Sequence, residues 1–146
     1  MDIILVLHVL GVVFWIGGVG FATMIIFPTI QSMDGSIEKA RLFLGVEKRF
    51  SRLAKGYVVA VGITGLMLFL RRGGLEDFGS LSILMLGFKI FVWLVFFILL
   101  FGAEKHIMKA LVSEHTDIKK AFRRMNIFHW FMLTLSGIAI IFGIEL

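Results

Sequence analysis

The stretch that decides the fold is residues 7–18, Leu-His-Val-Leu-Gly-Val-Val-Phe-Trp-Ile-Gly-Gly, within an uncharged run from Ile3 to Phe27. An apolar run of about 20 residues crosses a bilayer as a helix. We therefore predict a membrane span over residues 3–27 that ends at Pro28. One imidazole, that of His8, lies in this span, and a polar side chain there needs a partner on another helix or a metal.

Composition indicates the protein class. With 59% hydrophobic residues, 16 Phe and one Pro in 146 residues, the chain is typical of integral membrane proteins. The absence of cysteine excludes disulfides, thiolate metal sites, iron–sulfur clusters and covalently attached haem. The first span lacks the basic start and cleavage site of a signal peptide, so we expect it to be retained.

Three further apolar runs lie at about residues 53–70, 78–103 and 125–144. We expect Ser36 to begin a helix that runs into the second span, and Thr116 and Asp117 to begin the helix of the fourth. The third helix is expected to continue to about Ser113. The sequence thus predicts an all-α integral membrane four-helix up-down bundle, with cytoplasmic helix extensions and a single transmembrane domain over residues 1–146.

Basic residues gather in two connections and indicate the orientation of the chain. The positive-inside rule places both connections in the cytoplasm and both termini outside, in the cell inner (plasma) membrane. Anionic lipid of the bilayer is the expected partner of these charges, and nucleic acid is not. The connections contain Lys39, Arg41, Lys48, Arg49 and Arg52, and Lys105, Lys109, Lys119, Lys120, Arg123 and Arg124.

Small residues share a helical face with His8. At 3.6 residues per turn this face carries Gly11, Trp15, Gly18 and Ala22, which leaves a slot beside the imidazole. Such a slot suits either a closely packed neighbouring helix or a planar ligand such as a porphyrin, whose iron would take the imidazole nitrogen. Both alternatives remain open at the level of sequence.

A lysine lies deep in the third span. Lys89 is about ten residues from the outer end of that span, where an ammonium must be neutral, paired or hydrated. Either it has a functional role, or it is bonded to backbone carbonyls or a lipid headgroup. Met67 and Met85 fall near the depth of His8, so a sixth ligand to a haem iron could come from Met67, Met85 or Lys89.

A second membrane histidine, His129, enters the fourth span from the opposite side. By helix rise it lies about 15 Å from the level of His8, too far for both to bind one metal. His129 could meet His106, with His115 nearby, in a second metal site on the inner side. The alternative is a set of interfacial histidines in an aromatic belt with Trp130.

The first three spans resemble the copper-resistance protein D family (CopD). The similarity lies in residues 8–18, 49–54 (Arg-Phe-Ser-Arg-Leu-Ala), 64–66 (Thr-Gly-Leu) and 87–90 (Gly-Phe-Lys-Ile). The resemblance implies a compact membrane protein that handles copper. In this reading His8, Met67 and Met85 are soft ligands for copper(I).

The chain also resembles the HemJ-type protoporphyrinogen oxidases, although residues 21–28 and 54–57 depart from that family's pattern. This resemblance implies haem b, with His8 as an axial ligand and Lys89 in the same site. It also implies an oxidoreductase that passes electrons from protoporphyrinogen towards the respiratory chain. The residues that carry it are His8, Gly11, Trp15, Gly18, Glu47, Lys48, Arg49, Lys89, Phe122, Arg123 and Asn126.

Three functions remain as alternatives. The first is a haem b membrane cytochrome for electron transfer, in which Gly11, Gly18 and Trp15 border the porphyrin. In that reading Lys89 pairs with a propionate, serves as a ligand or positions a proton as a catalytic group, and a quinone or another redox protein is the partner. The second is copper binding or transport, and the third is a structural membrane subunit without cofactor. A homo-oligomer is compatible with each of them.

Overall fold

The structure is a computed structural model that describes residues 2–34, 36–73, 79–103 and 118–144. Within these ranges the chain is all-helical, as predicted. Four helices are long and apolar enough to cross a membrane, which supports a multi-pass membrane protein. They cover Ile3–Ser32, Arg41–Arg71, Ser80–Gly102 and Arg123–Ile144.

The first helix consists of α1 (Ile3–Phe21), a π-helical turn η1 (Ala22–Ile26) and α2 (Phe27–Ser32). The helix continues past Pro28 to Ser32, beyond the predicted span over residues 3–27. In η1 the Phe27 N–H donates a hydrogen bond to the carbonyl of Ala22, five residues earlier, in place of the usual four. The hydrogen-bond register of the helix has therefore changed by one residue before Pro28. Pro28 then occupies the first turn of α2, where a missing N–H is tolerated.

The second helix, α3 (Ser36–Arg71), is continuous and begins at Ser36 as predicted. The third span is α4 (Ser80–Ile98) followed by the π-helical turn η2 (Leu99–Ala103), and the fourth is α6 (Ile118–Ile144). The predicted extension to Ser113 and the predicted helix start at Thr116 and Asp117 lie outside the described residues.

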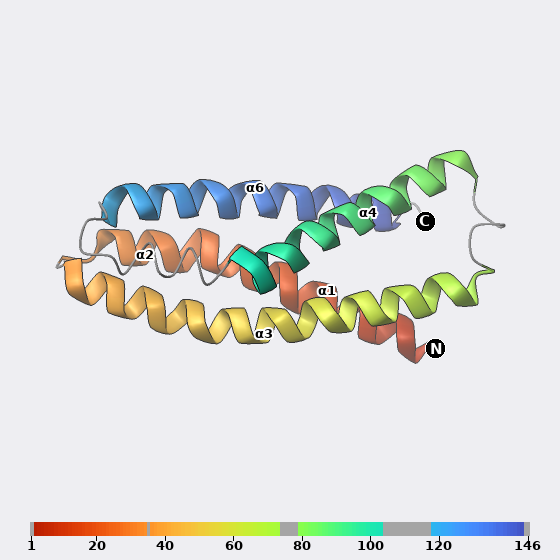
Figure 1. Cartoon of the computed structure of the whole chain (residues 1–146), viewed down its shortest axis with the longest axis horizontal. Helices are drawn as coiled ribbons and strands as arrows, with labels where there is room; N and C mark the ends of the chain where they lie inside the picture. The colour runs from red at the N-terminus through yellow and green to blue at the C-terminus, as the bar shows by residue number, and fades with distance from the viewer. Residues whose placement is uncertain (1, 35, 74–78, 104–117, 145–146) are drawn as a thin grey trace.

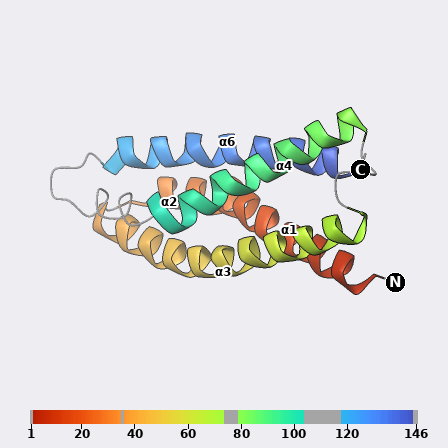
Figure 2. The same cartoon turned by 45° about the vertical axis from the view of Figure 1, so that its right-hand side comes forward.

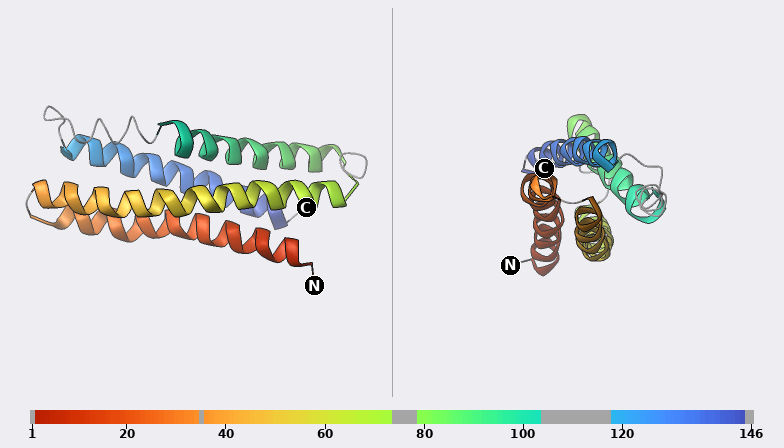
Figure 3. Two further views of the ribbon diagram at one scale, coloured as in Figure 1. Left: turned by 60° about the horizontal axis from the view of Figure 1, so that its bottom comes forward. Right: turned by 90° about the vertical axis from the view of Figure 1, so that its left-hand side faces the viewer.

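The helices lie along one common direction, and the two marked ends of the chain lie at the same end of the molecule (Figure 1). α1 packs mainly against α3, and α4 mainly against α6 (Figure 3). We call residues 3–14, 59–71, 80–91 and 133–144 the terminal half. Residues 15–58, 92–103 and 118–132, which carry most of the basic side chains, form the basic half.

The core is concentrated in the basic half. After Val61 on α3, before Val92 on α4 and after Ser136 on α6, none of the described residues is buried. Figures 1 and 2 show why: α4 lies near α3 at its η2 end and diverges from α3 towards Ser80. The two buried clusters comprise Trp15, Val19, Val58, Val61, Val92, Phe96 and Met132, and Ala22, Phe27, Ile30, Phe43 and Met125.

One side chain joins the two helix pairs. The indole N–H of Trp93 on α4 donates a hydrogen bond to the Val58 carbonyl on α3, at 2.8 Å. The ring lies over Gly62, where an added Cβ would be 2.5 Å from Trp93 Cζ2. The glycine is therefore required for this close approach.

Candidate functional site

His8 is oriented by a threonine of the neighbouring helix. Its Nδ1 lies 3.0 Å from the Thr64 hydroxyl oxygen, which itself donates to the Ala60 carbonyl at 2.7 Å. Because the hydroxyl proton is already engaged, the hydroxyl accepts and Nδ1 donates. The proton of the neutral imidazole therefore resides on Nδ1, and Nε2 keeps a free lone pair.

The His8 ring packs against Gly65, the residue after Thr64. A Cβ on Gly65 would lie 3.1 Å from His8 Cε1 and 3.6 Å from Nδ1. The imidazole thus rests directly on the backbone of α3. Two consecutive residues fix it, Thr64 by a hydrogen bond and Gly65 by the absence of a side chain.

The slot expected beside His8 is filled by α3. A Cβ on Gly11 would be 2.8 Å from Val61 Cγ2, and one on Gly18 would be 2.6 Å from Phe50 Cε2. Of the two alternatives drawn from the sequence, the structure has a closely packed helix on this face. A porphyrin on His8 therefore does not fit between Gly11 and Gly18 and needs another side of the ring.

The predicted partners of His8 lie in the terminal half. Lys89 on α4 is half-buried and close enough for its charge to act on His8. Met85 on the same helix is half-buried, whereas Met67 on α3 is 44% exposed. The exposed apolar side chains of α3 and α4 in the same half include Ile63, Leu66, Leu70, Leu81 and Leu84.

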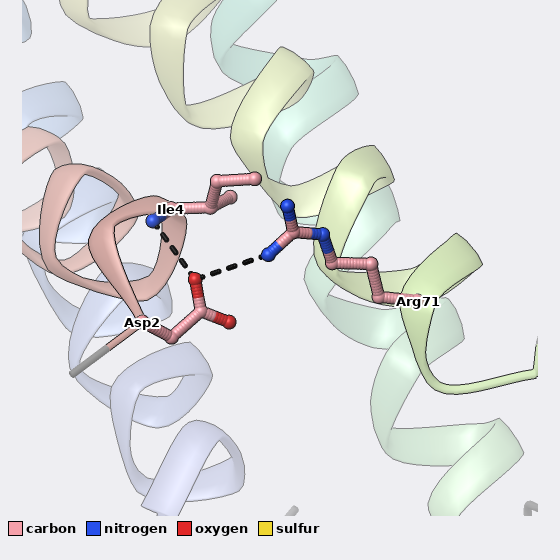
Figure 4. Close-up of polar contacts among 3 residues, drawn as sticks. All are labelled: Asp2, Ile4 and Arg71. Carbon is pink, nitrogen blue, oxygen red and sulfur yellow. Dashed lines mark hydrogen bonds and ion pairs between the residues drawn. The ribbon is translucent and has the colours of Figure 1, made fainter.

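One end of the molecule has an ion pair that ties α1 to α3. The Asp2 carboxylate accepts a hydrogen bond from the Ile4 N–H at 3.0 Å, as the N-cap of α1, and pairs with Arg71 at 3.3 Å (Figure 4). Both charged side chains are largely exposed. The pair holds the start of α1 beside the end of α3, on the side of the molecule that contains His8.

The basic half contains a cavity of about 80 Å³ between α1, α3, α4 and α6. His129 lines it and is buried, with its Nδ1 3.0 Å from the Met125 carbonyl. A carbonyl only accepts, so Nδ1 donates and Nε2 again keeps its lone pair. Other lining residues are Trp15, Glu47, Phe50, Phe96 and Met132.

The two histidines belong to separate sites. His8 contacts α3 at Thr64, whereas His129 shares its cavity with Ala54 on that helix. Ten residues of helix separate these levels by about 15 Å, in agreement with the separation expected from the sequence. His106, the predicted companion of His129, lies outside the described residues, and among those described no group of three or more His, Asp or Glu side chains could hold a metal.

Two residues gain roles that the sequence did not assign to them. Thr64 and Glu47 were named only among the residues that carry the two family resemblances. The sequence did contain a signal for this role of Thr64. Its hydroxyl lies in the second span at about the depth of His8, where it can form a hydrogen bond with the imidazole.

Comparisons of the chain with known protein families, with curated proteins and with solved structures found no match.

Proposed function

We propose that this chain is a haem b-binding membrane protein that transfers electrons, with Nε2 of His8 as an axial ligand. The four helices form an up-down-up-down bundle in the plasma membrane, with helix extensions and both basic connections in the cytoplasm and both termini outside. A quinone or a second membrane redox protein is the electron partner. The resemblance to HemJ-type oxidases supports haem as the cofactor.

The observation that carries this proposal is the hydrogen bond between His8 Nδ1 and Thr64. A histidine that binds a metal usually donates its other ring N–H to an oxygen, which fixes the orientation of the ring and makes the coordinating nitrogen more basic. Thr64 supplies that oxygen from a neighbouring helix. The lone pair of Nε2 is then available to an iron atom.

The terminal half offers a surface for the porphyrin. Several apolar side chains of α3 and α4 in this half are exposed, among them Ile63, Leu66 and Leu84, and the two helices diverge there (Figure 1). We propose that a flat apolar ligand binds on this side of the bundle, as ligands of helical bundles bind between helices. The α1 face at Gly11 and Gly18 is excluded by the contacts with α3.

Lys89 is the proposed partner of a haem propionate. It lies on α4, within electrostatic range of His8, at a depth where an ammonium needs a counter-charge. The bound haem would supply a one-electron change at iron. The chain would contribute the ligand, the orientation of that ligand and a compensating positive charge.

The first experiment is the visible spectrum of protein purified in detergent from haem-replete cells, before and after dithionite, with iron and copper analysed in the same sample. We expect a Soret band that shifts on reduction and is lost in His8→Ala. His129→Ala, which removes the other described membrane imidazole, should keep the band. A colourless wild-type protein would refute the proposal, and copper in its place would favour the copper-binding alternative.

The orientation can be tested separately because the chain has no cysteine. Asp34→Cys and Gly79→Cys introduce single thiols at opposite ends, at exposed positions. In intact cells a membrane-impermeant maleimide should label Gly79→Cys only. Labelling of Asp34→Cys alone would reverse the proposed topology without affecting the haem proposal.

A further inference from the structure

A second set of electron-pair donors lies in the basic half. We propose that the cavity between α1, α3, α4 and α6 binds one divalent transition-metal ion through Nε2 of His129 and the carboxylate of Glu47. This site is about 15 Å from the level of His8 by helix rise. It does not depend on the proposed haem.

His129 is prepared as a ligand. Its Nδ1–H is held by the Met125 carbonyl of the preceding turn, so Nε2 lies on the opposite edge of the ring with its lone pair free. The ring is buried and packs edge-on against Phe27, with centroids 4.6 Å apart. Metal-binding histidines are commonly oriented in this way by a backbone carbonyl.

Glu47 brings a negative charge from another helix to the same cavity. The donors are the imidazole nitrogen of His129 and the carboxylate of Glu47. Nitrogen and oxygen together favour ions such as Fe²⁺, Ni²⁺ or Zn²⁺ over Mg²⁺ or Ca²⁺, which prefer oxygen alone. Water fills the remaining coordination positions.

The volume of the cavity suits a small ion and is too small for a porphyrin. A volume of about 80 Å³ has room for an ion with one or two waters, since a water occupies about 30 Å³. Pockets for drug-sized molecules are several times larger, so a porphyrin is excluded from this cavity. An ion therefore suits both the space and the donors.

Two buried polar atoms lie on the helices that border the cavity, although neither residue lines it. Ser51 Oγ and Asn126 Oδ1 have no hydrogen-bond partner within the described part of the chain. Each residue is adjacent in sequence to a residue that lines the cavity, Phe50 and Met125 respectively. Buried polar atoms are almost always satisfied, and ordered water is the usual partner where protein supplies none.

The backbone around the cavity is irregular. Leu99 and Leu100 of the π-helical turn η2 line it, and η1 begins three residues after the lining residue Val19. Single π-helical turns within α-helices occur frequently at functional sites. The turn η2 thus forms part of the wall of this cavity.

The test is calorimetric titration of chelator-treated, detergent-purified protein with Zn²⁺, with excess Mg²⁺ present. We expect one ion per chain. Binding should weaken more than about tenfold in His129→Gln and in Glu47→Gln, because changing even a hydrogen-bond partner of a ligand costs about 10–100-fold. His8→Gln is the matched control and should bind Zn²⁺ as the wild type does.

Thermal unfolding followed by circular dichroism checks that each variant is folded. If His129→Gln does not fold, Glu47→Gln decides, because Glu47 is only half-buried. The proposal is overturned if the wild type shows no saturable Zn²⁺ binding, if Glu47→Gln binds like the wild type, or if only His8→Gln loses the ion. The Soret band reports the haem proposal separately, so the two proposals fail by different readouts.

Discussion

Replacing Thr64 by valine removes the hydroxyl that orients His8 and leaves the shape of the side chain nearly unchanged. The His8 Nδ1–H then loses its acceptor at 3.0 Å. Loss of such a partner costs about 10–100-fold in metal affinity. The Val61 carbonyl also interacts with His8 and remains as an acceptor, so we expect the lower end, about tenfold, which is about 1.4 kcal/mol of binding free energy.

The assay is haem titration of apoprotein in detergent, followed at the Soret band, for the wild type, Thr64→Val and Thr64→Ser. Serine keeps the hydroxyl and should bind haem within about twofold of the wild type, since its oxygen still accepts from Nδ1. Equal affinity of the wild type and Thr64→Val would refute the role given to this hydrogen bond. An equal loss in both variants would contradict a role for the hydroxyl alone, since serine keeps the hydroxyl and valine keeps the methyl group.

Two further predictions concern stability, measured by thermal unfolding in detergent. Gly62→Ala should lower the free energy of unfolding by about 1–3 kcal/mol, because its Cβ would be 2.5 Å from the ring of Trp93. The control Gly56→Ala has open space around its Cβ and should be neutral or stabilising by up to about 1 kcal/mol; equal destabilisation of both would contradict the packing argument. Arg71→Gln breaks the exposed ion pair with Asp2 and should lower the free energy of unfolding by less than about 1 kcal/mol, because solvent and salt screen the two charges. A larger loss would contradict this screening.

The helices could be predicted from the sequence because the length of an apolar run is a local property. The predicted span over residues 53–70 lies within the observed span Arg41–Arg71. The end of the first helix could not be predicted, because Pro28 is a helix-stop signal unless a π-helical turn shifts the register before it. No hydropathy pattern reveals such a turn.

The candidate site could be predicted only in part. Depth in the predicted spans singled out His8 and Lys89 as candidates, and their roles stay predictions. The glycine spacing indicated a narrow face on α1, but it could not tell that Val61 and Phe50 fill that face, because those side chains come from another helix. The same limit applies to His129 and Glu47, which line one cavity from α6 and from α3.

The unequal distribution of the core between the two halves of the molecule has a consequence for its kinetics. Regions with few buried contacts open with low free energy, whereas well-packed regions open only with the whole fold. The turns of α3 and α4 in the terminal half should therefore exchange their amide hydrogens faster than the turns around Val58 and Val92. Local opening of the bundle would then start in the terminal half and reach the two buried clusters last.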